Sequence, residues 1–198
     1  MASGHGRAIL VAGATGLVGR EIVDALLTDR TVKAVHCVGR RPLAIKHPKL
    51  RTHVVDFTAF PALPQVDECY VALGTTIRVA GSQAAFRAID LDAIVAVANA
   101  AQAAGATKFG VVSAMGADPR SRVFYNRIKG EMELALTTMG LTSLVIARPS
   151  LLDGNRKALG QPERGGEGIG LWLTRRLRPL IPPNYRAILA KNVARALI

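Results

Sequence analysis

Tyr125, Lys129 and Ser113 are the side chains of this sequence best suited to acid–base chemistry. Tyr125 and Lys129 form a Y-x-x-x-K pair, and on a helix this spacing places both side chains on one face, with Cβ atoms roughly 5–6 Å apart. Free tyrosine has a pKa of ~10, so a phenol needs a nearby ammonium that favours its phenolate. Ser113 ends an expected strand, where its hydroxyl can orient a substrate oxygen. Most Y-x-x-x-K pairs are ordinary surface pairs, so the position of this pair in the fold decides its meaning.

A glycine-rich turn follows the apolar stretch at residues 8–12 and opens an amphipathic helix. Its spacing is G-x-x-G-x-x-G and differs from the commoner G-x-G-x-x-G. Glycine has no Cβ, so the backbone can approach a phosphate closely, and the N–H groups at the start of the helix can bind the anion. The alternative is an ordinary strand-to-helix turn without a ligand. The residues expected at the phosphates are Gly13, Thr15, Gly16, Leu17, Val18 and Gly19.

The end of the second expected strand carries Arg40 and Arg41 and no acidic residue. In dinucleotide-binding folds an acid at this position binds the ribose 2′-hydroxyl of NAD, whereas a basic residue accommodates the 2′-phosphate of NADP. We therefore predict NADP(H), the alternative being a solvated loop in an arginine-rich chain. Asp56, after the third strand, either hydrogen-bonds the adenine amino group or caps the next turn.

Strands and helices alternate along the chain, which predicts an α/β fold with a mainly parallel sheet and right-handed crossovers. We expect a three-layer, doubly wound Rossmann fold with strand order 3-2-1-4-5-6. The stretch from Pro42 to Leu50 contains two prolines, so a loop is expected there in place of a helix. The expected strands are 8–12, 32–38, 52–55, 69–73, 108–113 and 142–147, and the long expected helices are 17–28, 83–104 and 122–139.

The carboxyl ends of the expected strands bring the candidate residues together. In an open parallel sheet, ligands bind beyond these ends, near the point where the strand order reverses. The glycine turn, Arg40 and Arg41, and Asp56 then lie near Ser113. The further strand-end residues expected there are Leu73, Gly74, Thr75, Arg148, Pro149 and Ser150.

The length and composition predict one domain over residues 1–198, with a leader at 1–6 and a substrate-side flap at 151–185. Hydrophobic residues make up 49% of the chain, which excludes a disordered protein. The sequence has no apolar run near the ~20 residues of a membrane helix and no signal peptide. Cys37 and Cys69 fall in apolar segments and are expected as buried thiols, without a disulfide or a metal site, in a reducing cytoplasm.

The formal net charge of +12 admits nucleic acid, an anionic membrane surface or a phosphorylated small ligand as a partner. The sequence shows no basic platform with interleaved aromatic residues and no nucleic-acid motif. We therefore expect a small-molecule substrate, no specific nucleic acid, no membrane, and a monomer or homodimer.

Taken together, these motifs resemble the atypical branch of the short-chain dehydrogenase/reductase superfamily. The glycine turn and the Ser113, Tyr125 and Lys129 constellation are typical of that branch. Four segments are similar to the Tat-interacting-protein-like oxidoreductases, which are Rossmann proteins that bind NADPH. These segments are Ala72–Thr76, Val112–Ala117, Phe124–Glu131 and Arg148–Ser150.

The resemblance implies a role for each matching residue. Tyr125 would be the general acid/base, Lys129 would favour its phenolate and bind the nicotinamide ribose, and Ser113 would position the reacting oxygen. The backbone of residues 73–75 would pass the nicotinamide-side ribose and phosphates, and residues 148–150 would lie beside the nicotinamide. One departure is that other members carry an N-A-G-type motif where this chain has Leu73-Gly74-Thr75. Asn99 either replaces that asparagine in a proton relay or faces a neighbouring helix.

Two functions follow from the resemblance. The first is an NADP(H)-dependent oxidoreductase that transfers hydride to or from a small carbonyl or alcohol. The second is an NADPH-binding regulatory or interaction protein with little catalysis. Only 48 residues follow Ser150, which disfavours a nucleotide-sugar epimerase with a large C-terminal substrate domain.

Overall fold

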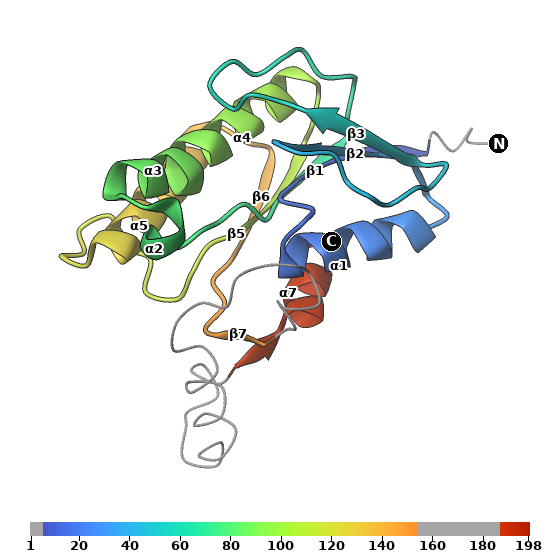
Figure 1. The fold of residues 1–198 in the computed structure, drawn as a ribbon. Helices are drawn as coiled ribbons and strands as arrows, with labels where there is room; N and C mark the ends of the chain where they lie inside the picture. The colour runs from blue at the N-terminus through green and yellow to red at the C-terminus, as the bar shows by residue number, and fades with distance from the viewer. Residues whose placement is uncertain (1–5, 154–186) are drawn as a thin grey trace.

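A fully parallel sheet of six strands forms the centre of the computed structural model, which describes residues 6–153 and 187–198 (Figure 1). The order β3-β2-β1-β4-β5-β6 confirms the predicted topology. The strand order reverses between β1 and β4, so the carboxyl ends of these two strands flank the expected binding position. The strands are β1 (Arg7–Ala12), β2 (Val32–Gly39), β3 (Leu50–Val54), β4 (Glu68–Val71), β5 (Lys108–Val112) and β6 (Ser143–Ala147).

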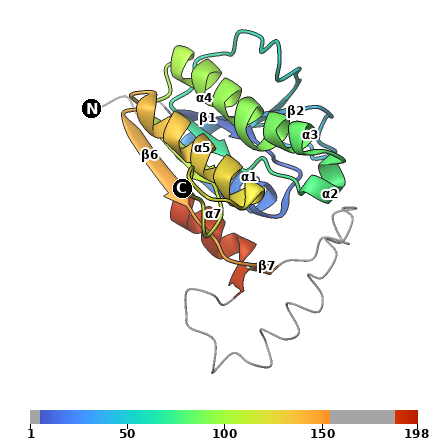
Figure 2. The same cartoon turned by 90° about the vertical axis from the view of Figure 1, so that its left-hand side faces the viewer.

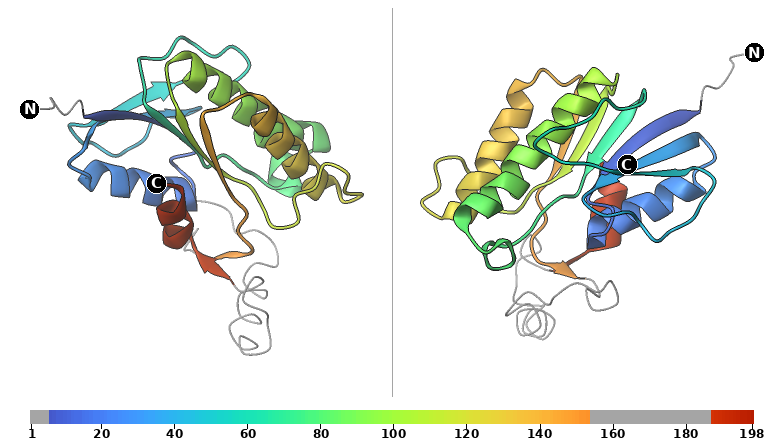
Figure 3. Two further views of the ribbon diagram at one scale, coloured as in Figure 1. Left: turned by 180° about the vertical axis from the view of Figure 1, so that it is seen from behind. Right: turned by 45° about the horizontal axis from the view of Figure 1, so that its top comes forward.

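Helices cover both faces of the sheet, which confirms the expected three layers (Figures 1 and 2). One face carries α1 (Leu17–Thr28) and α7 (Ala190–Leu197), which pack against each other. The other face carries α3 (Gln83–Arg87), η1 (Ala88–Asp92), α4 (Ala93–Ala103) and α5 (Phe124–Thr138). The rear view in Figure 3 shows the same separation of the two helical layers.

The two hydrophobic cores explain why β1 reads as a continuous apolar run. Ile9 and Val11 pack into the core under α1 and α7, whereas Leu10 and Ala12 pack into the core under α4 and α5. Burial on both faces is typical of central strands in parallel sheets.

The helix expected at 83–104 is divided, and a short helix that we did not predict precedes it. This helix, α2 (Ile77–Ala80), ends at Gly81, whose φ of +87° favours glycine. Ser82 then caps α3 by accepting a hydrogen bond from the Ala85 N–H. Between α3 and α4 the chain forms one π-helical turn, η1. Strand β4 ends at Val71, two residues before the expected Leu73, and residues 40–49 contain no helix, as predicted.

The described C-terminal segment returns beneath the sheet edge. β7 (Leu152–Asp153) pairs in parallel with β8 (Ile188–Leu189), and α7 follows at once. The predicted flap at 151–185 and the leader at 1–6 lie almost entirely outside the described residues. Within the described part of the chain, no helix has the length and apolar character needed to cross a membrane.

A pair of histidines links β2 to the edge strand β3. His36 Nδ1 lies 3.0 Å from His53 Nε2, and the rings stack with centroids 5.2 Å apart. Burial lowers the pKa of His36 below its ordinary value of 6.5, and the nearby His53 and Arg51 lower it further. The folded protein therefore favours a neutral His36.

This pair predicts that acid destabilises the fold. Because the pKa of His36 is lower in the folded state, the unfolded chain binds more protons below pH 6.5, and stability is lost as the pH falls through that value. Urea unfolding at about pH 7.5 and about pH 5 should show a larger loss of stability for the wild type than for His36→Gln. Equal losses in both proteins would contradict the assignment.

Candidate functional site

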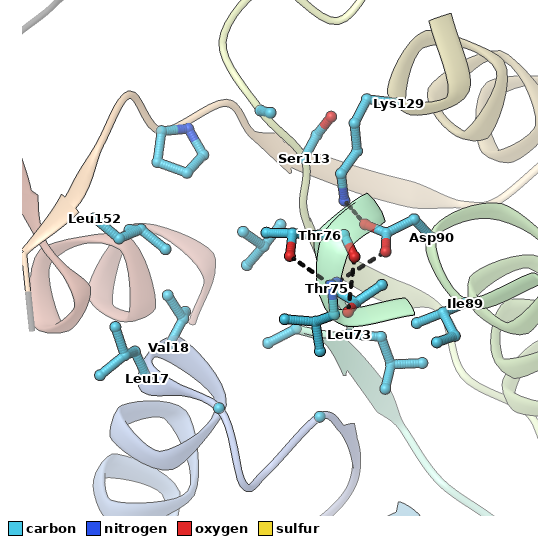
Figure 4. Close-up of a pocket in the computed structure, with 18 of the residues that line it drawn as sticks. Leu17, Val18, Leu73, Thr75, Thr76, Ile89, Asp90, Ser113, Lys129 and Leu152 are labelled. Atoms are coloured by element: carbon cyan, nitrogen blue, oxygen red, sulfur yellow. Dashed lines mark hydrogen bonds and ion pairs between the residues drawn. The ribbon is translucent and has the colours of Figure 1, made fainter. Parts of the chain in front are cut away.

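A cavity of about 460 Å³ lies at the carboxyl ends of the central strands. Its size is that of a typical ligand pocket. Gly13, Thr15, Gly16, Leu17 and Val18 line one side of it. Figure 4 shows Leu17 and Val18 across the cavity from Ile89 and Asp90. The same cavity is lined by Leu73, Gly74, Thr75, Ser113, Tyr125, Lys129, Pro149 and Ser150, so the topology brings most of the predicted residues together.

The glycine turn depends on close backbone contacts. Gly13 has a φ of +87°, and a Cβ there would lie 2.4 Å from the Ala72 carbonyl oxygen. A Cβ on Gly19 would lie 2.1 Å from the Gly13 carbonyl oxygen. Gly19 does not line the cavity. Its missing Cβ allows α1 to begin directly against the end of β1. The Gly16 N–H closes the turn by donating to the Gly13 carbonyl oxygen at 2.9 Å.

A smaller cavity of about 100 Å³ adjoins the first and shares Gly13, Thr15, Arg40, Arg41 and Leu73 with it. Phe57 supplies an aromatic wall, and Cys37 lies at its base. Both arginines are exposed. Each of the two arginines thus lines both cavities.

Asp56 lies outside the lining of both cavities. Its Oδ1 accepts hydrogen bonds from the Thr58 N–H and the Thr58 hydroxyl, both at 2.8 Å. These two bonds lower the pKa of Asp56. The observed contacts are those of the turn-capping alternative, and a contact with adenine stays a prediction.

Ser113 follows β5 directly and offers an unused hydrogen-bonding group. Its backbone N–H donates to the Ala147 carbonyl oxygen at 2.8 Å, which continues the pairing of β5 with β6. Its Oγ is buried and has no hydrogen-bond partner within the described protein. Buried hydroxyls are normally paired, so this one is available to a ligand oxygen in the cavity.

Tyr125 and Lys129 lie one turn apart on α5 and both line the cavity, as the spacing predicted. Gly130 allows this placement, because a Cβ there would lie 2.1 Å from the Pro119 backbone nitrogen. The half-buried Tyr125 ring packs against Phe86 with centroids 5.5 Å apart. Helix α5 therefore lies directly against the loop that follows Ser113.

Sequence reasoning missed Asp90. Its carboxylate is fully buried in η1, with Oδ1 2.7 Å from the Lys129 ammonium and Oδ2 accepting from the Thr75 N–H at 2.9 Å (Figure 4). The available signal was a charged residue four positions after Phe86 and four before Ile94, on an apolar helical stripe. Asn99, which we considered for a relay, is exposed on α4.

Arg148 does not line the cavity, unlike Pro149 and Ser150. Its Nε donates to Glu133 Oε1 at 3.0 Å, and its Nη2 forms an ion pair with the same carboxylate. These bonds raise the pKa of the guanidinium. Arg148 thus ties the end of β6 to α5, while the Met115 N–H donates to the Pro149 carbonyl oxygen at 3.0 Å.

The sequence comparisons agree with this geometry. A family model described as NAD(P)H-binding matches residues 13–170. The mitochondrial protein FMP52 of Coccidioides immitis is 32% identical over 163 residues, which cover 74% of this chain and 66% of that protein. Protein HTATIP2 of Rattus norvegicus is 29% identical over 202 residues, which cover 97% and 80%. The chain therefore spans about two thirds of the length of the fungal relative.

Solved structures share the fold at low sequence identity. The oxidoreductase ylbE from Lactococcus lactis superposes with a TM-score of 0.65 at 18% identity, covering 94% of this chain and 81% of that one. The UDP-N-acetylglucosamine 4-epimerase from Methanobrevibacter ruminantium M1 gives a TM-score of 0.70 at 17% identity, covering 96% and 71%. At such identities the likeness concerns the fold alone.

The backbone contact of Gly19 predicts a strong effect of a single methyl group. Gly19→Ala should lower the free energy of unfolding by about 2 kcal/mol or more, because the new Cβ meets backbone that has no room to move. Gly39→Ala is the matched control, since its Cβ would make an ordinary contact at 3.6 Å. Urea unfolding measures both, and similar losses in the two variants would contradict this account of the turn.

Proposed function

Since the chain belongs to the NAD(P)H-binding family and has the fold of atypical short-chain dehydrogenases/reductases, we propose that it is an NADP(H)-dependent oxidoreductase. Its substrate would be a small carbonyl compound or the corresponding alcohol. One observation carries the proposal: Ser113, Tyr125 and Lys129 line the same cavity as the glycine turn. A dinucleotide bound at the turn would thus extend toward groups that can hold and move a proton.

The residues present fit such a cofactor. Gly13 and Gly16 line the cavity without a side chain, and the start of α1 offers N–H groups to a diphosphate. The segment from Leu73 to Thr75 would pass the nicotinamide-side ribose, with the Lys129 ammonium as a hydrogen-bond donor to it. When bound, the reduced nicotinamide supplies a hydride, which carries two electrons to the substrate carbon.

The chain's own residues would handle the proton. In carbonyl reduction the Tyr125 hydroxyl donates its proton to the substrate oxygen, and solvent then restores that proton. The Ser113 hydroxyl, which has no hydrogen-bond partner among the described residues, would donate a hydrogen bond to the same oxygen and orient it. The reverse reaction would use the Tyr125 phenolate as the base.

The preference for NADP(H) is supported by Arg40 and Arg41. Both line the two adjoining cavities, and a pair of guanidinium groups suits a 2′-phosphate in charge and geometry. Asp56, the nearest acid in the chain after them, has its carboxylate engaged by Thr58.

A reducing compartment is part of the proposal. Cys37 and Cys69 are free and buried, and burial raises the pKa of Cys37 to about 12. A cytoplasmic location stays a prediction. The fungal relative FMP52 is named as a mitochondrial protein.

Reversing the charge of the arginine pair tests the cofactor preference. Arg40→Glu/Arg41→Glu should weaken NADPH binding at least about tenfold and leave NADH binding nearly unchanged, because only NADPH carries the 2′-phosphate. Isothermal titration calorimetry measures both affinities. The control Arg30→Glu/Arg195→Glu has the same charge change on exposed residues outside both cavities. An equal loss in the control would point to bulk charge instead.

Tyr125→Phe tests the proposed chemistry. Turnover of NADPH with a panel of small aldehydes and ketones should fall at least about a hundredfold, because the proton donor is gone. NADPH affinity should change less than about twofold, since the ring is retained. Unchanged turnover would refute the role of Tyr125. NADPH binding without turnover of any substrate by the wild type would favour the regulatory alternative.

A further inference from the structure

The buried carboxylate of Asp90 joins two parts of the site that are distant in sequence. Asp90 has no exposed surface and Lys129 is 3% exposed. Oδ1 pairs with the Lys129 ammonium at 2.7 Å, and Oδ2 accepts from the Thr75 N–H at 2.9 Å. Gly74 lies directly beside the pair, since a Cβ there would make ordinary contacts, 3.5 Å from Asp90 Oδ1 and 3.9 Å from Lys129 Nζ.

Other charged groups on the surrounding elements are engaged elsewhere. Asp92 in the same π-helical turn is 60% exposed, and its Oδ1 lies 4.0 Å from Arg87 Nε. Within the described residues, the other charged side chains of α3, α5 and the adjoining loops form ion pairs away from Lys129, except Arg122, which is exposed before α5. These pairs are Arg87–Glu131, Arg127–Glu131, Arg148–Glu133 and Arg120–Asp118. Asp90 is therefore the counter-ion of Lys129 in this structure.

We propose that Asp90 is a positioning residue that balances the charge of Lys129 and keeps Tyr125 in its protonated form, so that the site favours carbonyl reduction. This inference rests on the proposed function. An unbalanced ammonium beside a phenol strongly favours the phenolate, whereas a buried pair of opposite charges has a much weaker net field. Tyr125 can then donate its proton when the hydride reaches the carbonyl carbon.

Asp90→Asn removes the negative charge and keeps the shape, and the amide oxygen can still accept from Thr75. We expect the rate of NADPH-dependent carbonyl reduction to fall as the pH rises. The pH at which it falls should be about one unit lower in this variant than in the wild type. Asp92→Asn is the matched control, because it removes an exposed carboxylate two residues away. A loss of activity in Asp90→Asn without any displacement of the pH profile would reduce Asp90 to a structural role and overturn the proposal.

The ultraviolet absorbance of the phenolate gives a second readout that needs no substrate. The contribution of Tyr125 is the difference between each protein and its Tyr125→Phe counterpart, measured as the pH is raised. It should appear about one unit lower in Asp90→Asn than in the wild type. If no carbonyl compound is turned over, the proposed function fails while this titration still decides the role of Asp90.

The double variant Asp90→Asn/Lys129→Met avoids a lone buried charge, which can prevent folding. In Lys129→Met the carboxylate is unopposed, so the Tyr125 phenolate should appear at a higher pH than in the wild type. Removing both charges should return the transition to within about half a unit of the wild type, because the pair is balanced. A double variant that titrates like Lys129→Met alone would overturn the proposal.

Discussion

The carbonyl group of Gly13 lies too close to Gly19 to leave room for a Cβ there. The first turn of α1 therefore packs directly against the backbone at the end of β1. A similar contact joins Gly13 to the Ala72 carbonyl beyond β4. These contacts occur where the strand order reverses, between β1 and β4. Because α1 packs against Gly13, and Gly13 packs against Ala72, the turn forms a fixed floor of the cavity, and the other strand ends are arranged around it.

The opposite wall of the cavity depends on a second close approach, at Gly130. This glycine brings α5 against the loop that follows β5, so that Lys129 reaches Asp90 in η1. The ion pair connects two helices with the segment after β4 through Thr75. Two glycines without a Cβ, Gly19 on α1 and Gly130 on α5, thus allow close backbone approaches on opposite sides of the cavity. The walls of the cavity come from both halves of the sheet.

Local patterns were sufficient to predict the sheet order, the glycine turn and the shared face of Tyr125 and Lys129. The sheet order follows from the alternation of strands and helices along the chain, and the other two follow from fixed spacing within one element. The partner of Lys129 was not predictable in this way, because a π-helical turn sets the direction of Asp90 and long-range packing brings it to α5. For the same reason the sequence did not reveal that Arg148 pairs with Glu133. The break between α2 and α3 depends on Gly81 and on the Ser82 cap, which are short signals.

Arg40 and Arg41 differ from the glycines in one respect that bears on how such a protein can evolve. Both arginines are exposed, and neither forms a hydrogen bond or ion pair with another described residue. Almost no substitution is tolerated at Gly13 or Gly19, because any side chain there would meet backbone atoms. Substitutions at exposed arginines carry little cost in stability, so selection can change these two residues, and with them the nucleotide preference proposed above, without first passing through an unstable intermediate.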